Sequence, residues 1–215
     1  MSEFTAKPLT ASQLAALQSS LHRGSAAASA ALADWIGKPS LVEIDSLNQL
    51  PLEEATTILS KGAEPICFCS MDVQGVIRGE IILAFEDSSG LALAGMLLEQ
   101  PEETCTAWSE LATSAVVETA NIVCCSYLNS LSNDLSVTDD TPALVPAPPR
   151  FSREFAESLM QFALMDQAIA FDQVILAQTR FQIDGEHVDW TLLFVPDAES
   201  MTRLPELLAD RQNGV

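Results

Sequence analysis

Residues 108–131, with the sequence WSELATSAVVETANIVCCSYLNSL, contain neither proline nor glycine, so nothing in them interrupts a helix. Glu102, Glu103 and Glu110 lie at or near the start of this stretch, where the helix dipole favours negative charge. At about 100° per residue, the apolar side chains gather on one broad face. The stretch therefore predicts a long helix with one buried side, which consists of Val116, Ala120, Val123, Cys124, Tyr127 and Leu131.

Three polar residues form a line on the opposite side of this predicted helix. Ser114, Glu118 and Asn121 are spaced i, i+4 and i+7, so their side chains project together. Polar pairs at this spacing are also common on solvated helix faces. The spacing alone leaves two interpretations open: an ordinary wet surface, or a helix that presents these side chains to a partner.

The rest of the chain predicts a second long helix at Thr10–Trp35, and short strands and helices after each long helix. The expected strands are Leu41–Leu47, Ile66–Val73, Glu80–Phe85, Ile169–Ile183 and His187–Val195. The expected short helices are Leu52–Leu59, Gly90–Leu98, Arg153–Met165 and Met201–Leu208. Residues Ser132–Arg150 are rich in Asp, Ser, Thr and Pro, which predicts a loop with at most one short strand.

This order of elements occurs twice, and matching residues recur at a constant spacing. The long helices superpose at an offset of 99, and the elements after them at an offset of 110, which places an insertion before Arg150. We therefore expect an α+β fold with two pseudo-symmetric halves, whose long helices lie side by side on one continuous sheet. It would be a single domain over residues 1–215 with repeats of about 8–100 and 105–210. The matches at 110 are Gly75 with Gly185, Leu83 with Leu193, Asp87 with Asp197, and Leu97-Leu98 with Leu207-Leu208.

The formal net charge of −20 disfavours nucleic acid and anionic membranes as partners, because both attract basic surfaces. The apolar runs are short for a membrane span, and the first residues lack the pattern of a signal peptide, so we expect a cytoplasmic protein. The five cysteines match no common zinc pattern. Their odd number and the lack of a secretory signal predict reduced thiols that pack as small apolar side chains.

The segment from Ser114 to Leu131 resembles the signature of the CheC/CheX/FliY family of chemotaxis phosphatases. That signature is Asp or Ser, three residues, Glu, two residues and Asn, followed by an apolar helix. The resemblance covers most of the chain, since Thr10–Pro39 is similar to the first long helix of the family. It implies a CheC-like fold with two antiparallel helices over one mostly antiparallel sheet. It also implies hydrolysis of the phospho-aspartate of a CheY-like receiver domain.

The resemblance assigns roles to the three polar residues. Glu118 would pair with the active-site lysine of the receiver, and Asn121 would orient the water that attacks the acyl phosphate. Ser114 would support recognition of the receiver. The Mg²⁺ ion would belong to the receiver, so no cofactor or metal site is expected in this chain.

The sequence departs from the family pattern in two places. The first long helix has Ser19 and His22 where many relatives repeat Glu and Asn, so its outer face is expected to be silent. Ala120 replaces the usual glycine before Asn121, a change expected to alter how closely the backbone of the partner approaches. These departures keep an alternative open: a non-catalytic module that binds a receiver, a CheD-like deamidase or a flagellar switch component. The end of the sequence at Val215, soon after the second repeat, disfavours the flagellar version.

Overall fold

The computed structural model describes residues 8–59, 65–100, 105–135, 143–155, 158, 173–184 and 186–209. Seven strands in this part of the chain form one antiparallel sheet in the order β1-β6-β7-β3-β2, and both β4 and β5 pair with β2. The strands are β1 (Ser40–Pro51), β2 (Ile66–Gln74), β3 (Gly79–Glu86), β4 (Val145–Pro146), β5 (Arg150–Glu154), β6 (Gln173–Ile183) and β7 (Glu186–Pro196). The helices are α1 (Ala11–Ile36), α2 (Leu52–Leu59), α3 (Asp87–Leu97), α4 (Glu110–Asp134) and α6 (Ala198–Ala209).

The two long helices, α1 and α4, form within one to three residues of their predicted bounds because the local sequence caps them. Thr10 and Gln13 make a capping box at the start of α1, where the Gln13 side chain accepts a hydrogen bond of 2.8 Å from the Thr10 N–H. Gly37 ends this helix in the left-handed conformation, with φ of 73°. Ser109 caps α4 by accepting a hydrogen bond of 3.1 Å from the N–H of Ala112.

Helices α1 and α4 lie against each other in opposite directions. The hydroxyl of Ser25 lies 3.1 Å from that of Tyr127, and Ser130 at the far end of α4 donates to the carbonyl of Ser20, 2.8 Å away. Gly24 makes this approach possible, because a Cβ atom at this position would lie 2.6 Å from Cδ1 of Tyr127. The face of α1 that carries Gly24 is therefore the contact surface between the two helices.

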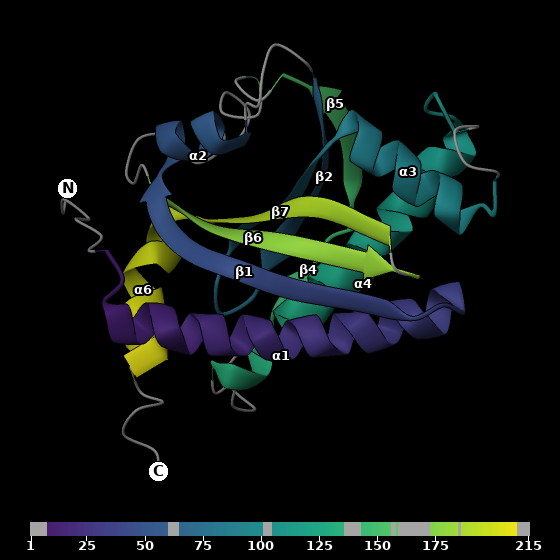
Figure 1. Ribbon diagram of the computed structural model, residues 1–215. Helices are drawn as coiled ribbons and strands as arrows, with labels where there is room; N and C mark the ends of the chain where they lie inside the picture. Colours follow the sequence, from purple (N-terminus) through teal and green to yellow (C-terminus); the bar gives the residue numbers. More distant parts are fainter. Residues whose placement is uncertain are drawn as a thin grey trace.

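The sheet is buried on both faces. The larger core lies between the sheet and the pair of long helices (Figure 1) and includes Trp190, whose ring stacks on Phe85 at 4.5 Å between centroids. Helix α2 lies over the opposite face and packs Ala55, Ile58 and Leu59 against it. The sheet residues buried on that face are Leu50, Ile66, Phe68, Ile82, Ala84, Val174, Leu176, Leu193 and Val195.

The pairing of the strands joins the two halves at the centre and at both edges. Strand β3 pairs with β7, with Ile82 opposite Leu193 and Leu83 opposite Leu192, which is the register of a twofold axis between them at the offset of 110. Strand β1 of the first half pairs with β6 of the second, and β5 of the second half pairs with β2 of the first. Each half thus contributes one strand that pairs with the other half. The residue bounds of the two repeats stay a prediction.

Several predicted elements differ in extent from the observed ones. Strand β1 continues beyond Leu47 to Pro51, past an irregularity between Ile44 and Ser46, and α3 begins at Asp87 rather than Gly90. The predicted helix Arg153–Met165 is wrong at its start, because residues 153 and 154 belong to β5. Most of the remainder of that segment, and Gly185, lie outside the described residues.

Helix α4 corrects the expectation that the apolar runs are short for a membrane span. Of the helices that the structure describes, it alone is long and apolar enough to cross a membrane by length and composition. The core helix of a globular domain passes the same test, and 44% of the relevant window is buried inside the protein. Its buried residues pack against α1 and the sheet, which accounts for its apolar composition.

Candidate functional site

Helix α4 separates its buried side from its polar line as the sequence predicts. The six residues of the predicted apolar face are all buried, whereas Ser114 and Glu118 are exposed and Asn121 is half-buried. Residues three and four apart on a helix have Cβ atoms about 5–6 Å apart. The three polar side chains therefore occupy one continuous strip of the surface.

The carboxamide of Asn121 is held from one side by the next turn of α4. The thiol of Cys125 donates a hydrogen bond of 3.4 Å to Oδ1 of Asn121. Burial raises the pKa of Cys125, and the negative charge of Glu118 raises it further, so the thiol keeps the proton that it donates. An amide oxygen has two lone pairs, so Oδ1 of Asn121 can accept a second hydrogen bond, and its NH₂ group keeps both donors.

Glu118 has an acidic side chain that no described residue pairs with. Its side chain is exposed and makes no ion pair with any residue that the structure describes. Thr119, the next residue, is fully buried and bonds back to the carbonyl of Ala115 at 3.0 Å, which keeps it on the inner side of the helix. Among the described residues, nothing therefore occupies the carboxylate of Glu118 where a cation of a partner could approach it.

A groove borders this strip towards the start of α4. It has a volume of about 400 Å³ and lies between the end of α1, the end of α3 and the first turns of α4. Ser114 and Glu118 line it together with two exposed apolar side chains, Trp35 and Leu111. The sequence does not predict this groove, because its walls come from three separate elements. The other residues that line it are Ile36, Lys38, Met96, Leu97, Leu98, Glu99 and Ala115.

The outer face of α1 has a different chemistry. Ser19 and His22, which match Glu118 and Asn121 at the offset of 99, are both exposed. The guanidinium of Arg23 donates a hydrogen bond of 2.9 Å to the hydroxyl of Ser19 and also pairs with the buried carboxylate of Asp134. A cation of the chain itself therefore lies beside the position on α1 that matches Glu118, whereas no described cation pairs with Glu118 on α4.

The expectation about Ala120 is wrong. This side chain is fully buried on the inner side of α4, so the partner does not meet it. Alanine in place of glycine changes helix propensity at this position and leaves the exposed strip unchanged.

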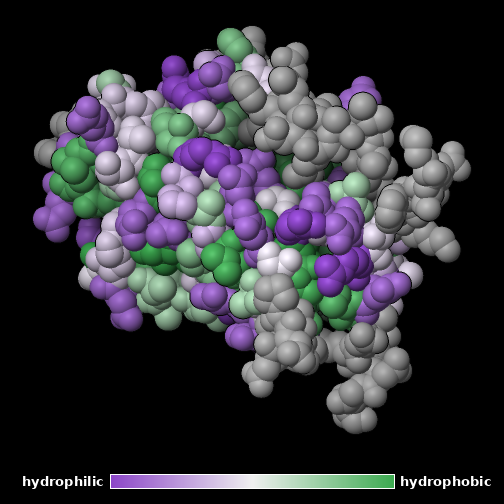
Figure 2. All heavy atoms as spheres, turned by 180° about the vertical axis from the view of Figure 1, so that it is seen from behind, coloured by the Kyte–Doolittle hydropathy of each residue, from purple (hydrophilic) through white to green (hydrophobic). Residues whose placement is uncertain are grey.

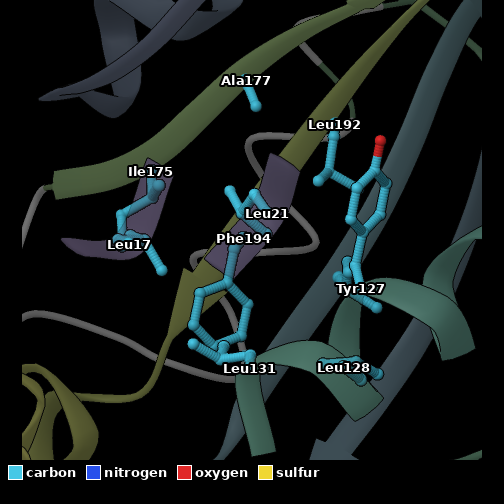
Figure 3. A pocket seen from close by; sticks show the side chains of 10 residues that line it. Leu17, Leu21, Tyr127, Leu128, Leu131, Ile175, Ala177, Leu192 and Phe194 are labelled. Carbon is cyan, nitrogen blue, oxygen red and sulfur yellow. The ribbon is translucent and has the colours of Figure 1, made fainter. Parts of the chain in front are cut away.

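A second cavity lies inside the core between α1, α4 and the sheet (Figure 3). Its volume is about 20 Å³, and apolar side chains such as Leu17, Phe194 and Leu131 line it. The hydroxyl of Tyr127 is engaged with Ser25, so the cavity offers a water molecule few partners. It is a packing void and no binding site.

No protein-family model matches the sequence. Solved structures are similar over nearly the whole chain. FliY from Thermotoga maritima is 17% identical with a TM-score of 0.76, and the match covers 96% of this chain and 100% of that one. The FliM middle domain from H. pylori is 14% identical with a TM-score of 0.65, covering 91% and 99%. The protein therefore has the CheC-like fold that is shared by FliY and the middle domain of FliM.

Proposed function

We propose that this protein is a phosphatase that hydrolyses the phospho-aspartate of a CheY-like receiver domain, with Glu118 as the anchor and Asn121 as the group that orients the water. One observation carries the proposal. On the outer strip of α4 an exposed carboxylate, which pairs with no described residue, is followed one turn later by a carboxamide whose oxygen accepts a hydrogen bond from Cys125. This arrangement coincides with the residues that resemble the phosphatase signature.

Hydrolysis of a phospho-aspartate needs few groups from this protein besides Glu118 and Asn121. Phosphoryl transfer depends on positioning and on neutralising charge rather than on covalent help from the protein. A water hydrogen-bonded to the free lone pair of Asn121 Oδ1 can be aligned for in-line attack on phosphorus. The amide is neutral, so it does not repel the phosphoryl oxygens as a carboxylate would. Mg²⁺ would be bound by the receiver and not by this protein.

Glu118 would fix the position of the receiver relative to α4. A carboxylate that pairs with a lysine of the receiver makes a charge-assisted hydrogen bond, which is stronger than a neutral one. Asn121 lies one turn further along α4, so this contact also sets the position of the amide. Ser114 lies one turn before Glu118 and would contact the receiver at the edge of its site.

A second candidate is a non-catalytic module that binds a receiver, a CheD-like deamidase or a flagellar switch component. Two observations favour it. Helix α1 lacks the Glu and Asn pair, and the fold is shared with FliM from H. pylori, which has been solved in complex with FliG and with SpeE. FliG and SpeE are partners of that FliM. For this protein, a receiver domain is the first partner to test.

The decay of a phosphorylated receiver separates the two candidates. A stand-alone CheY-like receiver from the same organism is loaded with acetyl phosphate, and phosphate release is followed with and without this protein. Asn121→Ala should slow the stimulated hydrolysis about 10²-fold or more, the scale of a lost positioning group. His22→Ala, the matched position on α1, should change nothing. If the protein binds the receiver but does not speed the loss of its phosphoryl group, the phosphatase proposal is wrong and the non-catalytic module is supported.

A further inference from the structure

The groove beside Glu118 is an apolar surface without a partner in the described chain. Leu111 and Trp35 are 62% and 44% exposed, although side chains of this size are usually buried. Met96, Leu97 and Leu98 at the end of α3 close the groove from the other side. Figure 2 shows hydrophobic side chains that reach the surface at its left edge, the side of the molecule where α3 lies.

The groove is continuous with the candidate site. Ser114 and Glu118 belong to both, since they line the groove and are part of the polar strip. At 1.5 Å of rise per residue, Leu111 and Asn121 are about 15 Å apart along α4. A protein interface of standard size covers about 800 Å² on each side. A receiver that reaches Asn121 and Glu118 therefore also covers the groove.

The charges around the groove select the kind of surface that fits it. Glu99 and Glu118 are exposed acidic residues that line it, and Lys38, the basic residue among the described lining residues, is already paired with Asp184 at 3.7 Å. The groove thus offers an apolar floor with a negative rim. It suits an apolar side chain that has a lysine or arginine beside it.

We propose that the groove takes one aliphatic or aromatic side chain of the receiver, which the receiver presents next to the lysine that pairs with Glu118. This inference rests on the proposed function, because it names a second contact of the same partner. The groove has few polar groups that converge on one point, so it does not resemble a site for a small polar ligand. It adds affinity for the receiver, and the hydrolysis itself stays with Asn121.

A pair of matched variants tests the groove. Leu111→Asp places a charge in the groove, whereas Val145→Asp places the same charge at a side chain of similar exposure, 60%, that lies on β4 outside it. Binding of a receiver loaded with beryllofluoride and Mg²⁺ is measured by titration calorimetry. Leu111→Asp should weaken binding at least tenfold and raise KM by the same factor, while Val145→Asp should leave both unchanged.

Trp35 gives a second readout. Its ring lines the groove, so its emission should shift to shorter wavelength when the receiver covers it. The difference in emission between the protein and Trp35→Phe isolates this signal from Trp108 and Trp190. A shift that appears with the loaded receiver and disappears in Leu111→Asp supports the proposal, and the absence of a shift during binding overturns it.

The outcomes for the groove and for the catalytic strip can be told apart. If Asn121→Ala abolishes stimulated hydrolysis but Leu111→Asp binds the receiver normally, the groove is not a receiver contact and the phosphatase stands. If Leu111→Asp weakens binding but Asn121→Ala changes nothing, the groove is a receiver contact of a non-catalytic module. If Leu111→Asp alters the oligomeric state by sedimentation and not receiver affinity, the groove contacts a second copy, which overturns the proposal.

Discussion

Helices α1 and α4 have the same place in the two halves of the molecule and the same kind of N-terminal cap, yet they differ on their outer faces. The inner faces are both closed against the sheet. On the outside, α4 has an exposed carboxylate without a partner among the described residues and a half-buried carboxamide, and α1 exposes a serine that already bonds to Arg23. Packing constrains the inner positions of both helices, whereas the outer positions can diverge without loss of the fold.

The contact between the two helices shows the same divergence in the core. Gly24 of α1 lies against Tyr127 of α4. At the offset of 99 the reciprocal positions are Val123 and Ala28, which are both fully buried. The first pair combines the smallest residue with a large ring, whereas the matching positions hold valine and alanine. Side-chain volume is therefore distributed differently between the helices at the two pairs of positions, so the two halves have different packing.

Making α1 more like α4 at this contact should have the largest effect. Gly24→Val introduces the residue that α4 has at the matching position. Its Cβ would meet Tyr127 at 2.6 Å from Cδ1 and 2.9 Å from Cα. Overpacking of this kind costs about 3 kcal/mol, measured as the free energy of unfolding in urea. Ala26→Val, on the exposed face of the same helix, should cost less than about 1 kcal/mol.

The double variant Gly24→Val with Tyr127→Ala sharpens the same comparison, since it copies the reciprocal pair. The two changes should couple, so that the double variant is more stable than the sum of the single losses predicts. Strict additivity would show that the two residues do not share the contact.

Asp87 and Asp197 offer a second comparison at the starts of α3 and α6, with an intermediate effect. Asp87 accepts hydrogen bonds from Trp108 at 2.7 Å and from Arg153 at 2.8 Å. Asp197 faces Arg78 at 3.5 Å and caps the N–H of Ser200. Loss of charge-assisted hydrogen bonds costs about 2 kcal/mol, so Asp87→Asn should destabilise the fold by roughly that amount and Asp197→Asn by less.

The pH dependence of stability checks the role of Asp87. Burial alone would raise its pKa, but the hydrogen bonds from Arg153, Trp108 and Cys67 outweigh burial and hold the pKa below its ordinary value of 3.8. The ionised group therefore stabilises the fold above about pH 4, and this contribution is lost as the pH falls through the lowered pKa. Urea unfolding from pH 6 to pH 3 should show a shallower loss of stability in Asp87→Asn. An unchanged slope would contradict this role.

Grafting the polar strip onto α1 should have the smallest effect. Ser19→Glu with His22→Asn would give α1 the pair that α4 carries. Because Arg23 already reaches Ser19 at 2.9 Å, it would neutralise the new carboxylate. Two independent sites would at most double kcat/KM for the phosphorylated receiver, and the graft should raise it by less than about twofold. A full twofold gain would show that Arg23 does not interfere.

The sequence predicted those parts of the fold that local chemistry determines. Thr10 and Gly37 specify the ends of α1, and the apolar period of α4 specifies its buried side. Strand β5 was not predicted, because its residues are mostly exposed and do not alternate between buried and exposed positions. It forms a strand through pairing with β2 and through the ion pair of Arg153 with Asp87, and both partners are distant in the sequence.

The candidate site divides in the same way. The exposure of Glu118 and the inward position of Ala120 follow from the helical period, and the error about Ala120 came from reading a motif without that period. The groove depends on where α1 and α3 end relative to α4, which no local pattern encodes. In the sequence, the groove is marked only by Trp35, a large apolar residue next to the last residue of α1, and its exposure is seen in the structure.

The exchange of edge strands bears on how the protein is made. Ser40 pairs with Ile183, so the first strand of the sheet waits for its neighbour until most of the chain has left the ribosome. Pairings this distant in sequence form slowly, and until then both edges of β1 are unpaired. A cut between the halves would take β1 from β6 and β5 from β2 at once, so neither half could be released as an autonomous module. The chain is assembled as one unit although it is built from two similar ones.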